Sequence, residues 1–247
     1  MIIFLLTFLF VYGGINVYAF VRARSILHFP LPVAIPIIVI LVFLVLAPAL
    51  VRISESRQLE ALACTLAYIG YLWMAFIFLF FVSCLTFDAA RYIFSLFQAA
   101  GRSPAASLLA FFLAVFISLA LVIYGFRDAQ IIRVKRLEIN VNQALPDNGR
   151  LRIVQISDVH IGLIIQEKRL QKVLEAVKKE NPDLLISTGD LLDGELNNVM
   201  PLASQFDQIK PKYGKFAVTG NHEFYAGIES ALTFTRQAGF AVLRNEK

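Results

Sequence analysis

The sequence predicts a multi-pass α-helical membrane domain followed by an α/β domain. Three observations support this prediction. Residues 1–126 contain nine charged residues, whereas residues 127–247 contain 32. The first part holds four long uncharged stretches, and in the second part short apolar runs alternate with amphipathic helical patterns. A mean hydropathy of +0.68 excludes a single soluble globule and a disordered chain, because both need a larger share of polar residues.

The uncharged stretches predict four membrane spans. Residues 1–21, 25–51, 61–87 and 103–126 contain no Asp, Glu, Lys or Arg. Each is long enough to cross a bilayer, which takes roughly 20 mostly apolar residues. No positive charge precedes the first stretch, and no clear small-residue cleavage site comes before Arg22, so we expect a retained span and not a cleaved signal peptide. Residues 1–126 are therefore predicted to form a four-helix transmembrane domain.

Prolines and charges refine the limits of these spans. Two prolines before residue 34 suit the start of the second helix, which is expected to run from about 34 to 50. The dipeptide Ser103-Pro104 suits the start of the fourth helix. Between the third and fourth spans, residues 88–102 predict a short interfacial helix.

Little in the spans points to chemistry inside the membrane. Transport pathways usually leave ionisable groups within the bilayer, and here only His28 is near, close to a predicted helix end. Cys64 and Cys84 lie twenty residues apart on one predicted helix, so they predict neither a disulfide nor a metal pair. With cytoplasmic termini, six Lys/Arg face the cytoplasm and four face the other side, which favours a cytoplasmic second half. The net charge of +5 is spread without a dense basic block, so no nucleic-acid partner is expected.

The second part reads as strands and helices in alternation. Residues 134–141 alternate between apolar and polar, which predicts a strand, and residues 127–150 are interpreted as a first strand and a linker. Residues 151–247 are interpreted as an α/β domain, because strands alternating with helices form a layered sheet. The predicted strands are 151–157, 183–188, 215–220 and 240–243, and the predicted helices are 166–180, 197–209 and 228–238.

Polar clusters directly follow three of these strands. They are Asp158-Val159-His160, Gly189-Asp190 and Gly220-Asn221-His222-Glu223. Ligand sites in α/β sheets form at the carboxyl ends of strands, so the clusters are expected to converge on one site. In an extended Asp-x-His both side chains point the same way and can reach one ion.

The residue types in the clusters suit divalent metal ions. Asp and His are ligands for first-row metals, Asp190 can bridge two ions, and Asn221 offers a neutral oxygen. His222 is placed to donate a hydrogen bond or a proton. Two metals held together can activate a water and stabilise a displacement at phosphorus. A Gly-Asn-His followed by Asp or Glu arises by chance in roughly 4 of 10,000 chains of this composition, so this motif is specific.

Residues 134–247 resemble the calcineurin-like metallophosphoesterase family. The segments that carry the resemblance are RIVQISDVHIG, PDLLISTGDLLDG and GKFAVTGNHEFY. Their sequences are most similar to those of the membrane-attached bacterial branch, which includes YkuE/YaeI-type enzymes and transmembrane metallophosphoesterases. The resemblance implies a four-layer α/β fold and two divalent ions, such as Mn, Fe or Zn. It implies that Asp158 and His160 bind the first metal, that Asp190 bridges, that Asn221 binds the second metal, and that His222 contacts the phosphate and assists the leaving group.

The family pattern also contains elements that this sequence lacks. The family completes its site with a later His and a Gly-His-x-His, and no His follows His222 here, so residues 151–247 are expected to be the N-terminal part of the domain. The predicted function is a membrane-attached phosphohydrolase of a bacterial inner membrane, acting on a phosphorylated small molecule or a lipid-linked substrate. The alternative is a catalytically incomplete fragment that serves as a membrane anchor or a partner-binding module. Asp193 is expected either to form a turn or to support a ligand, and Glu223 is expected either to be structural or to support a ligand.

Overall fold

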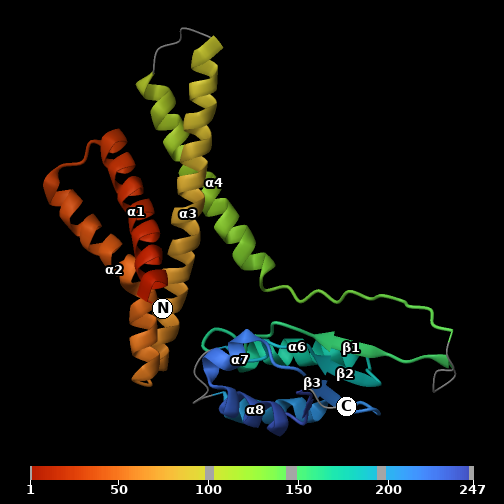
Figure 1. The fold of residues 1–247 in the computed structure, drawn as a ribbon. Coiled ribbons are helices and arrows are strands. Elements are labelled where there is room, and N and C mark those ends of the chain that lie inside the picture. The colour runs from red at the N-terminus through yellow and green to blue at the C-terminus, as the bar shows by residue number, and fades with distance from the viewer. Residues whose placement is uncertain (1, 98–102, 143–148, 194–198, 245–247) are drawn as a thin grey trace. The chain divides into compact units, whose positions relative to one another are not determined.

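The computed structural model describes residues 2–97, 103–142, 149–193 and 199–244. The chain divides into two compact units, Met1–Ile131 and Ile132–Lys247. The first unit is made of helices, and the second is an α/β unit around a parallel sheet (Figure 1). Each unit is described by itself below.

Four long helices make up the first unit. They are α1 (Ile2–Leu27), α2 (Leu31–Ser56), α3 (Glu60–Phe97) and α4 (Pro104–Asp128). All four are long and apolar enough to cross a membrane, as the uncharged stretches predicted. The chain is therefore a membrane protein.

Two predicted helix limits are wrong. Helix α2 is longer than expected, since it begins at Leu31, ends at Ser56 and contains two internal prolines. Prolines are tolerated inside membrane-spanning helices because neighbouring helices and local adjustments satisfy the freed backbone groups. A separate interfacial helix over 88–102 is also wrong for the described part, since α3 continues unbroken to Phe97. No glycine or proline lies between residues 88 and 97 to end the helix, and residues 98–102 lie outside the described part.

A buried polar network connects three helices of the first unit. Trp73 Nε1 on α3 donates a hydrogen bond to Asn16 Oδ1 on α1 at 3.0 Å, and Asn16 Nδ2 donates to the carbonyl of Tyr12 at 2.8 Å. The hydroxyl of Tyr12 in turn donates to the carbonyl of Leu44 on α2 at 3.4 Å. Asn16 is only 3% exposed, so its amide depends on these partners.

The second unit is built on a four-stranded parallel sheet with the order β1-β2-β3-β4 (Figure 1). Four helical segments connect or follow these strands. The strands are β1 (Ile153–Ile156), β2 (Leu184–Ser187), β3 (Lys215–Ala217) and β4 (Ala241–Val242), and the helical segments are α6 (Glu167–Lys179), the 3₁₀ helix η1 (Met200–Gln208), α7 (Asn221–Ala226) and α8 (Ile228–Gln237). The four strands and the helices α6 and α8 lie where the sequence predicted them.

The segment predicted as an α-helix over 197–209 is a 3₁₀ helix instead. Its apolar side chains explain the difference, because Met200, Ala203, Phe206 and Ile209 recur every third residue and all contact the core. A helix with three residues per turn places these positions on one face, whereas an α-helix would rotate them away from one another. Residues 194–198, which include the start of the predicted helix, lie outside the described part.

The predicted strand over 134–141 is also wrong, since this segment has no regular secondary structure. Leu137 is 73% exposed and Ile139 is 80% exposed. A strand needs a neighbour to complete its hydrogen-bond ladder, and within the described residues no strand pairs with this segment. Arg136 attaches this segment to α6, through two hydrogen bonds with Glu180, its C-cap residue, at 2.7 and 2.9 Å.

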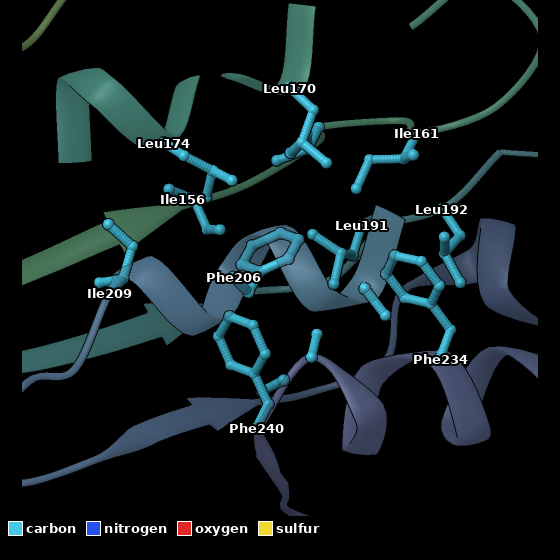
Figure 2. Packing of buried hydrophobic residues seen from close by; sticks show 14 of the residues in the cluster. Ile156, Ile161, Leu170, Leu174, Leu191, Leu192, Phe206, Ile209, Phe234 and Phe240 are labelled. Carbon is cyan, nitrogen blue, oxygen red and sulfur yellow. The ribbon is translucent and has the colours of Figure 1, made fainter. Parts of the chain in front are cut away.

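One hydrophobic core joins the sheet to its helices (Figure 2). Leu170 and Leu174 of α6 are fully buried, as is Phe206 of η1. The Phe206 ring lies edge-on to Phe240 at 5.5 Å between centroids. Leu191 and Leu192, which follow β2, also belong to this core. The loop that carries Asp190 is therefore anchored by buried apolar side chains directly after it.

Candidate metal centre

The three polar clusters leave the sheet at the same edge. The parallel register pairs Ile156 with Ser187 and Ser187 with Ala217, so β1, β2 and β3 end level with one another. The loops after β1 and β2 are also joined by their backbones. The N–H of Asp158 donates to the carbonyl of Gly189 at 3.2 Å, and the N–H of His160 donates to the carbonyl of Asp190 at 3.0 Å.

Three side chains, one from each loop, gather at this edge. His160, Asp190 and His222 are half-buried, and their ligand atoms all lie within 4.8 Å of one another. The two imidazole rings are nearly perpendicular, with 4.4 Å between their centroids. One carboxylate and two imidazoles at this spacing suit a first-row divalent ion.

The backbone conformation of the Asp-x-His motif differs from the extended one that was expected. Strand β1 ends at Ile156, and both Asp158 and His160 have left-handed backbone conformations, with φ of 53° and 52°. The prediction of an extended Asp-x-His is therefore wrong. The reason is that the N–H groups of Asp158 and His160 bond successive carbonyls, those of Gly189 and Asp190, whereas a regular parallel ladder would use carbonyls two residues apart. Asp158 Oδ1 still lies 4.0 Å from His160 Nε2, with the Asp158 side chain 65% exposed.

The Asp190 carboxylate is held in place by a hydrogen bond from His222 and by close packing against Gly220. Its Oδ1 accepts a hydrogen bond from the N–H of His222 at 2.9 Å, which ties the loop after β2 to the start of α7. Its own backbone is left-handed, with φ of 50°. Gly220 packs against this carboxylate so closely that a Cβ at position 220 would collide with Asp190 Oδ1. Glycine at 220 is thus required by the close approach of the two loops.

Glu223 is a buried residue that connects the loop after β2 with the loop after β3. It is 2% exposed, and its carboxylate accepts four backbone hydrogen bonds. The donors are the N–H groups of Leu191 at 2.7 Å, Asp190 at 3.1 Å, Leu192 at 3.3 Å and Gly220 at 2.7 Å. Sequence reasoning expected a structural role but missed these partners. The available signal was the position of Glu223 three residues after the N-cap Gly220, where a Glu reaches back to the helix start.

Asp193 orients the imidazole of His222. Its Oδ1 lies 2.9 Å from His222 Nδ1, in a loop that the sequence placed only as a turn or a support. With Nδ1 held by a carboxylate, Nε2 of His222 is the nitrogen left for the site. Asn221 opens α7 directly before His222, and its side chain is exposed.

Comparison with known proteins agrees with this geometry. Residues 151–242 match the family model of the calcineurin-like phosphoesterases. This part of the chain is a calcineurin-like metallophosphoesterase domain. The match spans all four strands of the sheet and all three polar clusters of the metallophosphoesterase domain.

Relatives from distant organisms share this domain. A metallophosphoesterase of Aquifex aeolicus is 39% identical over 132 residues, which cover 53% of this chain and 50% of that protein. A transmembrane protein with metallophosphoesterase domain from Danio rerio is 33% identical over 135 residues, or 54% of this chain and 31% of that protein. The metallophosphoesterase YkoQ of Bacillus subtilis is 27% identical over 144 residues, or 53% of this chain and 52% of that protein. The chain thus spans about half or less of the length of these relatives. No solved structure matches it.

Proposed function

We propose that this protein is a membrane-attached, metal-dependent phosphohydrolase that cleaves phosphoester or pyrophosphate bonds at a dinuclear metal site. One observation carries the proposal. His160, Asp190 and His222, which are spread over more than sixty residues, have ligand atoms within 4.8 Å of one another inside a metallophosphoesterase domain. A structural explanation of each residue alone does not account for their convergence at the carboxyl ends of three strands.

In this proposal each residue of the clusters has a defined role. Asp158 and His160 would hold the first ion, Asp190 would serve as a ligand to both ions, and Asn221 would hold the second, with Mn, Fe or Zn as the candidate metals. When bound, the ions supply an activated water and stabilise charge on the phosphoryl oxygens. His222 presents Nε2 to the phosphate and to the leaving oxygen, while Asp193 fixes the ring through Nδ1.

Attachment to the bilayer favours a substrate that is itself bound to the membrane. The four helices of the first unit hold the metallophosphoesterase domain to a membrane, which we place as the bacterial inner membrane with the domain on the cytoplasmic side. A phosphate or pyrophosphate carried by a lipid stays at the surface where the domain is tethered, so a lipid-linked substrate is favoured over a soluble one.

Hydrolysis by the purified full chain tests the proposal. The chain in detergent with Mn²⁺ is expected to hydrolyse bis-(p-nitrophenyl) phosphate, and Asp190→Asn and His222→Gln are expected to lose this activity. Glu175→Gln, an exposed carboxylate on α6, is the control and should retain it. Metal content is measured alongside by elemental analysis. Activity that persists after metal removal would contradict the proposal. A chain that binds no metal would instead be an anchor or a partner-binding module.

A further inference from the structure

A cavity of about 410 Å³ lies within the helical unit, between the last turns of α1 and the first turns of α4. The α1 side contributes Arg22, Ser25 and Ile26, and His28 follows directly after the helix. The α4 side contributes Ala105 and Ser107, together with two apolar neighbours. The lining therefore combines cationic, hydroxyl and apolar groups.

The cation Arg22 keeps hydrogen-bonding capacity beyond its ion pair. Its Nη2 donates to Asp88 Oδ1 on α3 at 2.7 Å, which fixes the guanidinium in place. Its Nε is buried and has no hydrogen-bond partner among the described residues. A buried N–H without an acceptor costs free energy, so this guanidinium would gain from an acceptor that reached it.

Further donors converge on the same cavity. Arg91 on α3 donates from Nη1 to Ser107 Oγ at 3.1 Å, so a second guanidinium contacts a residue that lines the cavity. Helix α4 also begins here, and its N-cap residue Ser103 makes no side-chain capping bond. The first N–H groups of α4 thus add the partial positive charge of a helix start to that of the two arginines. Asp88 is the single acidic side chain in these contacts.

The depth of the cavity matches that of lipid headgroups. The uncharged stretch of α1 ends at Arg22, and the uncharged stretch of α4 starts at its first residues. Helix ends that bound a roughly 30 Å apolar stretch lie at the level of the lipid phosphates. Leu108 of the lining is 41% exposed, and Leu27, which lies in sequence between the lining residues Ile26 and His28, is 44% exposed. These leucines offer acyl chains an apolar surface next to the polar lining.

We propose that this cavity binds the phosphate group of an anionic phospholipid. Arg22 is the principal contact through its guanidinium, and His28 and the first N–H groups of α4 complete the hydrogen bonding. The occupant is a lipid and not a soluble phosphate, because the cavity opens beside exposed leucines at the end of two membrane-spanning helices.

Native mass spectrometry of the full chain in detergent tests this inference. Phosphatidylglycerol is titrated against phosphatidylcholine, and glycerol phosphate serves as the soluble source of the same group. One saturable phosphatidylglycerol site is expected, with weaker binding of phosphatidylcholine. Arg22→Gln should weaken binding roughly tenfold, the usual worth of a charge-assisted hydrogen bond. The matched control is Arg24→Gln, an exposed arginine two residues away that does not line the cavity and should change affinity less than twofold.

Two further variants guard against a folding artefact. Asp88→Asn leaves Arg22 in place and removes the nearby negative charge, so it should bind the lipid at least as tightly as the native chain. The double variant Arg22→Gln, Asp88→Asn keeps the net charge and leaves no unpaired ion, and it should bind as weakly as Arg22→Gln. Equal losses in the Arg22 and Arg24 variants, or equal binding of the two lipids, would overturn the site. Competition by glycerol phosphate at the affinity of the lipid would overturn the assignment to a membrane lipid.

Discussion

Replacing Glu223 by Gln should loosen the loops of the candidate metal centre without changing the size of the side chain. In the native chain one carboxylate oxygen accepts from Leu191 and Leu192, and the other accepts from Asp190 and Gly220. Glutamine keeps one acceptor oxygen, and its NH₂ group must then face two backbone N–H donors. Because the residue is 2% exposed, water cannot replace the lost acceptor.

The magnitude follows from these bonds. A hydrogen bond to a charged group is worth about 1.5–3 kcal/mol, and two of the four are lost. A local loss of about 3–6 kcal/mol is therefore expected, which is a large part of the roughly 5–15 kcal/mol that stabilises a typical domain. A loss of that size raises the population of the opened loops by a factor of about 150 or more.

Hydrogen exchange followed by mass spectrometry measures this opening in the full chain. Peptides that contain Asp190–Leu192 and Gly220 should exchange faster by about two orders of magnitude in Glu223→Gln. Peptides from α1 to α4 should be unchanged. Glu229→Gln is the control, because Glu229 is exposed on α8. Native protection of the two loops in Glu223→Gln would show that the buried carboxylate does not hold them together.

Three other predictions test the fold and its pH response. Gly70→Leu should lower the thermal midpoint through about 1–3 kcal/mol of overpacking, because a Cβ at 70 would lie 2.8 Å from Ala47 Cβ. Gly125→Leu is its control, since a Cβ there meets nothing within 4 Å. Asp158→Gly should be more stable than Asp158→Ala by about 1 kcal/mol in the free energy of unfolding, because φ is 53° and glycine adopts this conformation without strain. Its thermal midpoint should therefore be higher, and equal midpoints would contradict the left-handed backbone. Arg136 lowers the pKa of Glu180 from its ordinary 4.5 through their hydrogen bonds, so the contact stabilises the fold above pH 4.5 and is lost as the pH falls through the lowered pKa. Exchange of residues 134–138 measured against pH should show this loss, and Glu180→Gln should show faster exchange at every pH.

The membrane helices and the strands were predictable because each leaves a local pattern. A charge-free stretch of twenty residues has few alternatives to a span, and short apolar runs such as LLIS in β2, bounded by turn residues, favour a buried strand. The limits of α3 were not predictable in the same way. The charges of Asp88 and Arg91 predicted the end of a span. In the structure Asp88 pairs with Arg22 of α1 and Arg91 bonds Ser107 of α4, so α3 continues past them.

The segment 134–141 shows a different limit of sequence reasoning. Alternating side chains indicate which face of a strand would be buried, but they carry no information about a neighbouring strand. Leu137 and Ile139 satisfy the pattern and are nevertheless exposed. For the site, the residue types indicated Asp158, His160, Asp190 and the Gly-Asn-His-Glu motif. The contact between Asp193 and His222 joins positions 29 residues apart, and such contacts depend on how two loops meet.

The backbone of the site explains why those loops meet so closely. Asp158, His160 and Asp190 all have positive φ, a conformation that costs roughly 1–2 kcal/mol for a residue with a Cβ. Such a cost persists only where other bonds offset it, and here the N–H groups of Asp158 and His160 bond the loop after β2 while Glu223 holds the N–H of Asp190. The same bonds place the Asp190 carboxylate beside the imidazoles of His160 and His222, with ligand atoms within 4.8 Å of one another. In the proposed metal site, the strain and the buried carboxylate thus have one common explanation, since both would hold these groups in position before a positive ion arrives.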